Sequence, residues 1–133
     1  MEIKYNDSTN LRPEGERVLD APIVKMELKE FIKTIKDESA WKEKDRNAIT
    51  LYKTNGLRIV LMAMRKDAVM ARHTADGILN LQVLDGKINF VYDEKTVELS
   101  GGEMVALHKG LPHSVQAIKE SVFLLTLTTS VDK

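Results

Sequence analysis

Apolar and polar residues alternate along most of the chain after residue 48, and this period of two predicts β-strands. The expected strands are residues 48–52, 57–64, 79–84, 87–92, 96–99, 104–107, 113–118 and 122–128. Short turn segments separate them, and the Asn55-Gly56 pair predicts a type I′ hairpin turn. Many short strands with regular spacing indicate an all-β sandwich or barrel.

One segment before the strands has a helical period instead. Leu28, Phe31, Ile32 and Ile35 follow the i, i+3, i+4, i+7 spacing of a single apolar stripe. The stripe predicts one N-terminal α-helix over about residues 26–41 that packs on the sheet. Trp41, at the end of this helix, is expected to anchor it against the barrel.

The chain has 133 residues, which is the size of one domain. We expect residues 1–20 to form a polar N-terminal arm. Residues 21–133 are then a single domain with its helix at about 26–41 and its barrel at about 48–129.

Composition removes several classes of function. Lys plus Arg and Asp plus Glu each number 20, so the formal net charge is zero and favours neither nucleic acid nor an anionic membrane as a partner. There is no Cys, which excludes disulfides, thiolate metal sites and Cys nucleophiles. Residues 1–10 are polar and unlike a signal peptide, and no apolar stretch has the length of a membrane span. We therefore expect a soluble, cytoplasmic protein.

Two histidines and three glycines in the strand region form a recognisable pattern. The residues are His73, Gly86, Gly102, Gly110 and His113. Their spacing resembles the two motifs of the cupin superfamily, and the resemblance covers about residues 58–127. It implies an all-β fold: a single cupin-like double-stranded β-helix, or jelly-roll barrel, carrying the N-terminal helix. It also implies a homodimer, because cupins commonly exchange N-terminal strands.

The same resemblance shows what this chain lacks. Cupins hold a metal with two histidines and a glutamate from the first motif and a histidine from the second. Here Ala75 stands at the second histidine and Leu79 at the glutamate, so only His73 and His113 remain. Further departures are Asp67, His108 and Ala117, at positions where the family has glycine, proline and asparagine.

Two imidazoles are fewer than the three protein ligands that an open catalytic metal site keeps. His108 is the candidate for a third ligand, and with it the chain would hold a divalent Mn, Fe, Ni or Zn ion. Asp76 is the candidate for a carboxylate that orients the His73 imidazole. In the alternative interpretation both histidines are structural: His73 bonds a backbone carbonyl and His113 caps a turn.

Strand parity places Leu79, Leu81 and Val83 on one face. If that face lines the barrel, the predicted ligand pocket consists of these three side chains with His73 and His113. Arg58, Arg65 and Arg72 are surface charges in the simpler interpretation, and they bind an anionic substrate if any of them faces the barrel mouth.

The sequence is compatible with three functions. The first is a small cupin-fold protein that binds a small-molecule ligand in the barrel without a standard four-ligand metal site. The alternative is a divalent-metal-dependent enzyme of the dioxygenase, isomerase or decarboxylase type that uses His73, His113 and a non-standard third ligand. A weaker one is a metal-free enzyme with a histidine base, as in sugar epimerases of this fold. The sequence identifies no catalytic residue and does not name the substrate.

Overall fold

The computed structural model describes residues 4–6 and 17–128 of the chain, and residues 4–6 by their backbone. Its elements in chain order are β1 (Lys4–Asn6), β2 (Arg17–Asp20), α1 (Leu28–Asp37), α2 (Ser39–Glu43), β3 (Arg46–Thr54), β4 (Leu57–Met64), β5 (Val69–His73), β6 (Ile78–Asp85), β7 (Lys87–Tyr92), β8 (Lys95–Ser100), β9 (Met104–Leu107), β10 (His113–Ala117) and β11 (Ser121–Thr128). None of the helices in these ranges is long and apolar enough to cross a membrane.

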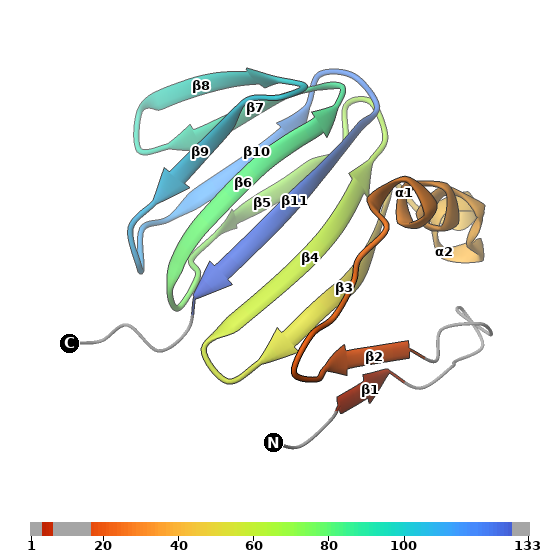
Figure 1. The fold of residues 1–133 in the computed structure, drawn as a ribbon. Coiled ribbons are helices and arrows are strands. Elements are labelled where there is room, and N and C mark those ends of the chain that lie inside the picture. Colours follow the sequence, from red (N-terminus) through yellow and green to blue (C-terminus); the bar gives the residue numbers. More distant parts are fainter. Residues whose placement is uncertain (1–3, 7–16, 129–133) are drawn as a thin grey trace.

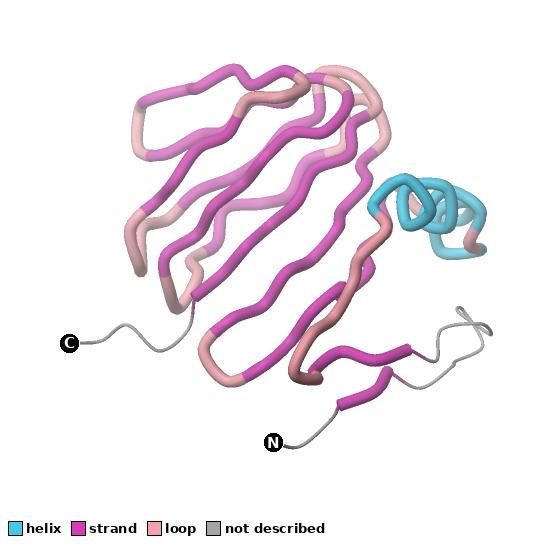
Figure 2. Tube along the Cα trace, in the orientation of Figure 1, coloured by secondary structure: helices cyan, strands magenta, loops and turns pink. Residues whose placement is uncertain are grey.

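Two antiparallel sheets face each other and form the barrel (Figures 1 and 2). One has the strand order β3-β4-β11-β6-β9, and the other has the order β5-β10-β7-β8. Strands that are distant in the sequence are therefore neighbours, as β11 is with both β4 and β6. This is the all-β jelly roll that the strand pattern and the resemblance predicted, and that prediction is confirmed.

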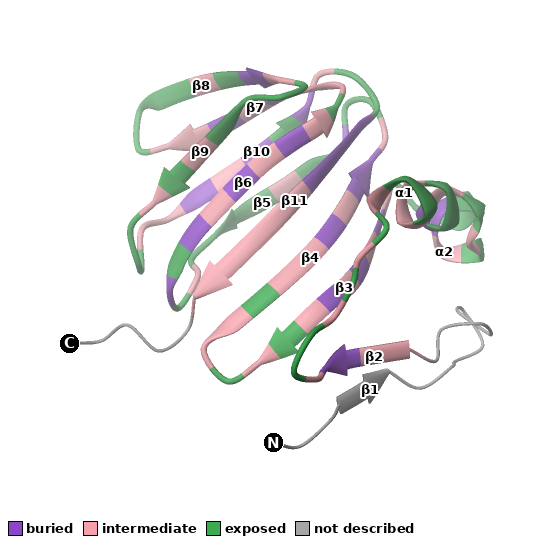
Figure 3. Ribbon diagram, viewed as in Figure 1, coloured by how far each residue is buried: buried purple, intermediate pink, exposed green. Residues whose placement is uncertain are grey.

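Side chains on both faces of β4 and β11, in the five-stranded sheet, pack into hydrophobic cores, and Figure 3 shows how burial varies along these strands. On β4, Met62 and Met64 contact the core between the two sheets, whereas Leu61 and Ala63 contact a second core under the helices. The alternation is the period of two expressed as packing, because successive side chains of a strand point to opposite faces. Even-numbered residues of β4 therefore face the space between the two sheets, and odd-numbered residues face the helices.

The helical segment packs on the outer face of the five-stranded sheet, beside β3 and β4 (Figure 1). Ile35 is fully buried there and Trp41 is nearly so, as expected for an apolar stripe and its anchor. The prediction of one helix over about 26–41 is wrong in detail, because the chain forms two helices that are separated at Glu38. Glu38 has an extended backbone with ψ of 151°.

A buried side chain from the sheet explains that break. The Asn47 amide nitrogen donates hydrogen bonds to the Ile35 carbonyl oxygen at 2.9 Å and to Glu38 Oε1 at 2.8 Å. One of the carbonyls that a helix leaves unpaired at its end is thereby satisfied by β3, which lies after both helices in the chain. The helical period of the sequence contains no sign of this contact.

The other differences from the expected elements are local. The strand β5 was not among the eight predicted, and the small sheet of β1 with β2 lies within residues 1–20, which were expected to form a polar arm. Leu19 in β2 is buried, and residues 1–3 and 7–16 of that arm lie outside the described ranges. The division of the chain at residue 20 stays a prediction.

Two glycines show how the turns depend on their surroundings. In the β3–β4 turn only Gly56 has a positive φ, so the turn is not the type I′ turn predicted from Asn55-Gly56, which needs positive φ at both residues. Gly86, between β6 and β7, has a φ of 98°, and a Cβ there would collide with the Glu120 carbonyl and the Ser121 hydroxyl. Glycine is therefore required at position 86 by both conformation and space.

The contact between Asn47 and α1 leads to a stability prediction. Replacing Asn47 with Ala leaves the buried Ile35 carbonyl without its donor, which costs about 1–3 kcal/mol. We expect urea unfolding to show a free energy of unfolding lowered by that amount. Asn89→Ala on β7, whose side chain makes no hydrogen bond within the described residues, is the control, and equal losses in the two variants would contradict this role of Asn47.

Candidate functional site

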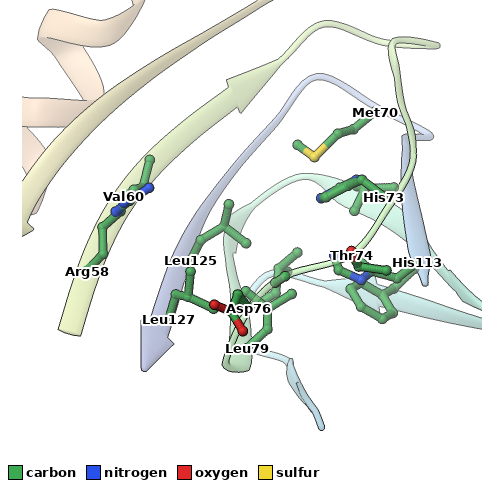
Figure 4. A pocket seen from close by; sticks show the side chains of 14 residues that line it. Arg58, Val60, Met70, His73, Thr74, Asp76, Leu79, His113, Leu125 and Leu127 are labelled. Atoms are coloured by element: carbon green, nitrogen blue, oxygen red, sulfur yellow. The ribbon is translucent and has the colours of Figure 1, made fainter. Parts of the chain in front are cut away.

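A cavity of about 490 Å³ opens between the two sheets (Figure 4). Side chains from β4, β5, β6, β7, β10 and β11 and from the β5–β6 loop line it, and most of them are apolar. The lining residues are Arg58, Val60, Met70, His73, Thr74, Ala75, Asp76, Leu79, Leu81, Phe90, His113, Val115, Leu125 and Leu127. A cavity of this size lies in the range of small-ligand sites, which is about 300–1,000 Å³.

The two histidines of the sequence motif meet in this cavity because β5 and β10 are neighbours. In the antiparallel register His113 lies directly opposite His73. Directly paired residues point to the same side of a sheet, so both imidazoles face the cavity. Their ring centroids are 4.4 Å apart, with an angle of 59° between the ring planes. Register thus unites two residues that are 40 positions apart in the sequence.

Each imidazole is oriented by a backbone carbonyl two residues earlier. His73 Nδ1 lies 2.8 Å from the Ala71 carbonyl oxygen, and His113 Nδ1 lies 3.0 Å from that of Leu111. A carbonyl oxygen only accepts, so Nδ1 carries the hydrogen in both rings. In the neutral form each Nε2 therefore keeps its lone pair. The carboxylate of Asp76, which was expected to orient His73, is instead exposed and paired with Lys109 Nζ at 3.5 Å.

The two histidines differ in their surroundings. His73 is exposed, whereas His113 is buried and stacks on Phe90 with 5.5 Å between ring centroids. Burial lowers the pKa of His113 below its ordinary value, the hydrogen bond with the Leu111 carbonyl acts in the opposite direction, and the neighbouring His73 lowers the pKa further. The His113 imidazole is therefore neutral at pH 7 and acts as a hydrogen-bond acceptor through Nε2.

The side chains around the pair do not complete a metal site. Ala75 and Leu79 line the cavity beside the histidines, but neither has a donor atom. Nowhere in residues 17–128 do three or more His, Asp or Glu side chains come together in a way that could hold a metal ion. His108, the candidate third ligand, is exposed and is not among the lining residues. The donor set therefore does not fit a resident divalent metal, which needs at least three protein ligands.

The structure brings four of the five residues of the predicted ligand pocket together in this cavity. His73, Leu79, Leu81 and His113 all line the cavity. Val83 shares their face of β6, but it is fully buried in the core and does not line the cavity.

The lining extends beyond the predicted residues to β4, β7 and β11. Strand parity can sort the residues of β4 and β11 into two faces, but it does not show that β11 lies between β4 and β6 or which face lines the cavity.

The three arginines considered as anion ligands have different positions. Arg58 lines the cavity, whereas Arg65 lies over the Trp41 ring with its guanidinium carbon 4.2 Å from the ring centroid. Arg65 also donates to the Trp41 carbonyl oxygen at 2.9 Å, so its role is to hold α2. Arg72 lines a separate hollow of about 220 Å³ behind His113. Only Arg58 of the three therefore faces the candidate site.

The lowered pKa of His113 predicts a dependence of stability on pH. The unfolded chain binds a proton at this residue near pH 6.5, and the folded chain binds it only at lower pH, so unfolding takes up a proton between the two values. The stabilising contribution is complete above pH 6.5 and is lost as the pH falls through the folded-state pKa. We expect the Tm of His113→Gln to fall less than the wild-type Tm between pH 7.5 and pH 5, with both pH values chosen to bracket this titration.

His108→Gln, which removes an exposed histidine, is the matched control and should keep the wild-type pH dependence in the same thermal-unfolding measurements. Parallel curves of Tm against pH for the wild type and His113→Gln would contradict the burial effect.

Comparisons with known proteins agree with this architecture. A conserved protein of unknown function from Streptococcus pyogenes has a TM-score of 0.61 at 24% identity, over 65% of this chain and 76% of that one. A cupin superfamily protein from Desulfitobacterium hafniense has a TM-score of 0.62 at 13% identity, over 65% and 79%. A salicylate 1,2-dioxygenase mutant from Pseudoaminobacter salicylatoxidans has a TM-score of 0.71 at 16% identity, over 83% of this chain but 37% of that one.

These likenesses show the fold, and the sequence shows the family. Curated proteins give no significant sequence match to the chain. The family model of the AraC-like ligand-binding domain, however, matches residues 58–131, which is more than half of the chain and includes every residue that lines the cavity. The chain belongs to the family of AraC-like ligand-binding domains, with the RmlC-like cupin fold.

Proposed function

We propose that the protein binds a small organic molecule in the cavity between its two sheets, without a standard four-ligand metal site. The cavity itself carries the proposal: about 490 Å³, lined mainly by aliphatic side chains, with the oriented His73–His113 pair at one side. Sites of this kind combine a large apolar wall with a few fixed polar groups that orient the ligand. The AraC-like ligand-binding family supports the same function.

The lining also indicates which part of a ligand each wall contacts. Leu79, Leu125 and Leu127 present an aliphatic surface from β6 and β11, on strands that pair directly with each other. Burying apolar ligand surface against them stabilises the complex by roughly 25 cal/mol per Å². The neutral His113 imidazole accepts a hydrogen bond, so a hydroxyl or amide donor of the ligand is expected at that side.

Filling the cavity tests this function directly. Leu127→Trp adds an indole to the wall, and it should weaken binding of the neutral fluorescent probe N-phenylnaphthylamine about tenfold or more, equivalent to about 1.4 kcal/mol. Fluorescence titration measures the change in Kd. The control is Thr126→Trp, which lies next to it on β11 but points to the opposite face and does not line the cavity.

Equal binding by the wild type and Leu127→Trp would place the probe elsewhere and would oppose the proposal. Weakening by Thr126→Trp to the same extent would show a general effect on the fold instead of a loss of cavity space.

A divalent-metal enzyme remains the alternative, and the one observation in its favour is the orientation of the two imidazoles. Both Nε2 atoms keep their lone pairs, which is the arrangement that metal-ligating histidines have. A dioxygenase, isomerase or decarboxylase would still need a third protein ligand, and no reaction is assigned because the described residues supply only two donors.

Elemental analysis separates the two functions. After incubation with Mn, Fe, Ni and Zn and exhaustive dialysis, we expect the purified protein to retain far less than one equivalent of metal. Close to one equivalent, lost in His73→Ala and His113→Ala, would instead establish a metal centre and overturn the binding-only proposal. His108→Ala in the same series tests the proposed third ligand, and loss of metal in this variant would show that His108 reaches the site.

The homodimer and the cytoplasmic location rest on the family resemblance and on composition. They stay predictions about the protein, and the ligand-binding proposal does not depend on either of them.

A further inference from the structure

A positively charged side chain, that of Arg58, lies on the cavity face of β4. Met62 and Met64 on this face contact the core between the sheets, and Val60 and Arg58, the next positions in the same alternating series, line the cavity. The opposite face, with Ile59 and its neighbours, packs under the helices. Arg58 is exposed at the open end of the strand, and Figure 4 shows it well apart from His73 and His113, with Leu125 and Leu127 between them.

A second positively charged side chain, that of Lys53, lies directly opposite Arg58 on the neighbouring strand. In the antiparallel register of β3 with β4, Lys53 pairs with Arg58. Directly opposed residues share one face of a sheet, and like charges in that arrangement destabilise it. Within residues 17–128 neither side chain has an ion pair or hydrogen bond to an acidic group. The strand pair therefore places the positive charge of Lys53 next to that of Arg58, which lines the cavity, and no acidic side chain of residues 17–128 pairs with either of them.

The one acidic side chain of the lining does not change this balance. Asp76 is exposed and already pairs with Lys109 at 3.5 Å, so these two charges cancel. Among the described lining residues, Arg58 is then the one charged side chain without an ion pair, and Lys53 lies opposite it on β3. An anion placed there would relieve their repulsion and gain the planar guanidinium as a two-pronged hydrogen-bond donor.

The other lining residues limit the chemistry of the part of the ligand that is attached to the anionic group. Leu79, Leu125, Leu127 and Val60 occupy the wall next to Arg58, and they offer neither donors nor acceptors. A polyhydroxylated ligand would leave several hydroxyls unpaired against them, and each unpaired buried polar group costs about 1–3 kcal/mol. An alkyl or aryl group buries against the same wall without this cost.

The geometry points to a carboxylic acid with an apolar body as the ligand class of this cavity. Its carboxylate lies at Arg58, next to Lys53, and its body runs along Leu79, Leu125 and Leu127 towards Phe90 and the histidine pair. This inference rests on the proposed function, since it names the ligand class of the same cavity. Arg58 is then the residue that selects acids over neutral molecules of equal size.

Two probes of the same chain length, one anionic and one neutral, test the inference. Isothermal titration calorimetry compares octanoate with octanamide on the wild type, on Arg58→Gln and on the charge-matched control Arg72→Gln, which lines the separate hollow. We expect the wild type to prefer octanoate about tenfold or more, as the loss of one charged hydrogen-bonded contact implies. Arg58→Gln should abolish the preference by weakening octanoate alone, and Arg72→Gln should keep it.

Further measurements keep the result independent of any single variant. Arg58→Lys retains the positive charge and should keep part of the preference, and Lys53→Gln should lower octanoate affinity by a smaller factor than Arg58→Gln. Added salt should weaken octanoate binding and leave octanamide binding unchanged, because the two cations are exposed to screening.

Different results would contradict the inferred ligand class and the proposed binding function. Equal affinity of both probes for the wild type, with both lost in Leu127→Trp, would show a binding cavity without an anion subsite and would overturn this inference alone. If neither octanoate nor octanamide binds, the inference is overturned. If, in addition, Leu127→Trp binds N-phenylnaphthylamine as well as the wild type does, the proposed function is overturned too.

Discussion

The strand β11 is buried on both faces, and the rest of the structure depends on this burial. Val122 and Phe123 are adjacent in the chain and both are fully buried, one in the core under the helices and the other in the core between the sheets. The strand lies between β4 and β6, so its backbone is also paired on both edges. A central strand with this environment holds the helices, the five-stranded sheet and one wall of the cavity in a single arrangement.

The same strand explains why a cavity forms at one end of the barrel. Near Phe123 the interior is closed by fully buried side chains such as Val83, its partner on β6, whereas towards Leu125 and Leu127 the residues of β11 become only partly buried. The space between the sheets therefore widens along β11 from a packed core into an open pocket. Any molecule that binds the folded state there adds to its stability, because the unfolded chain offers no such wall.

Charge and apolar surface are separated within that pocket. A buried, neutral imidazole stacked on Phe90 lies at one side, and Arg58 opposite Lys53 lies at another, with leucine side chains between them. In a metal-binding cupin the positions of Ala75 and Leu79 would carry a histidine and a carboxylate. Here a methyl and an isobutyl group replace these polar side chains, so this part of the wall lacks the donor atoms and the negative charge that would hold a cation.

The sequence by itself determined most of the strands and the helical segment before them, because the periods of two and 3.6 are local properties. Its resemblance to the cupins implied the jelly roll and showed, through Ala75 and Leu79, which metal ligands are missing. Only the tertiary structure decided that His73 lies opposite His113, that Asn47 ends the first helix, and that Arg58 faces the cavity. The physical reason is that alternation shows that a strand has two faces. Which strands become neighbours, in which register, and which face encloses a cavity depend on contacts between residues that are far apart in the chain.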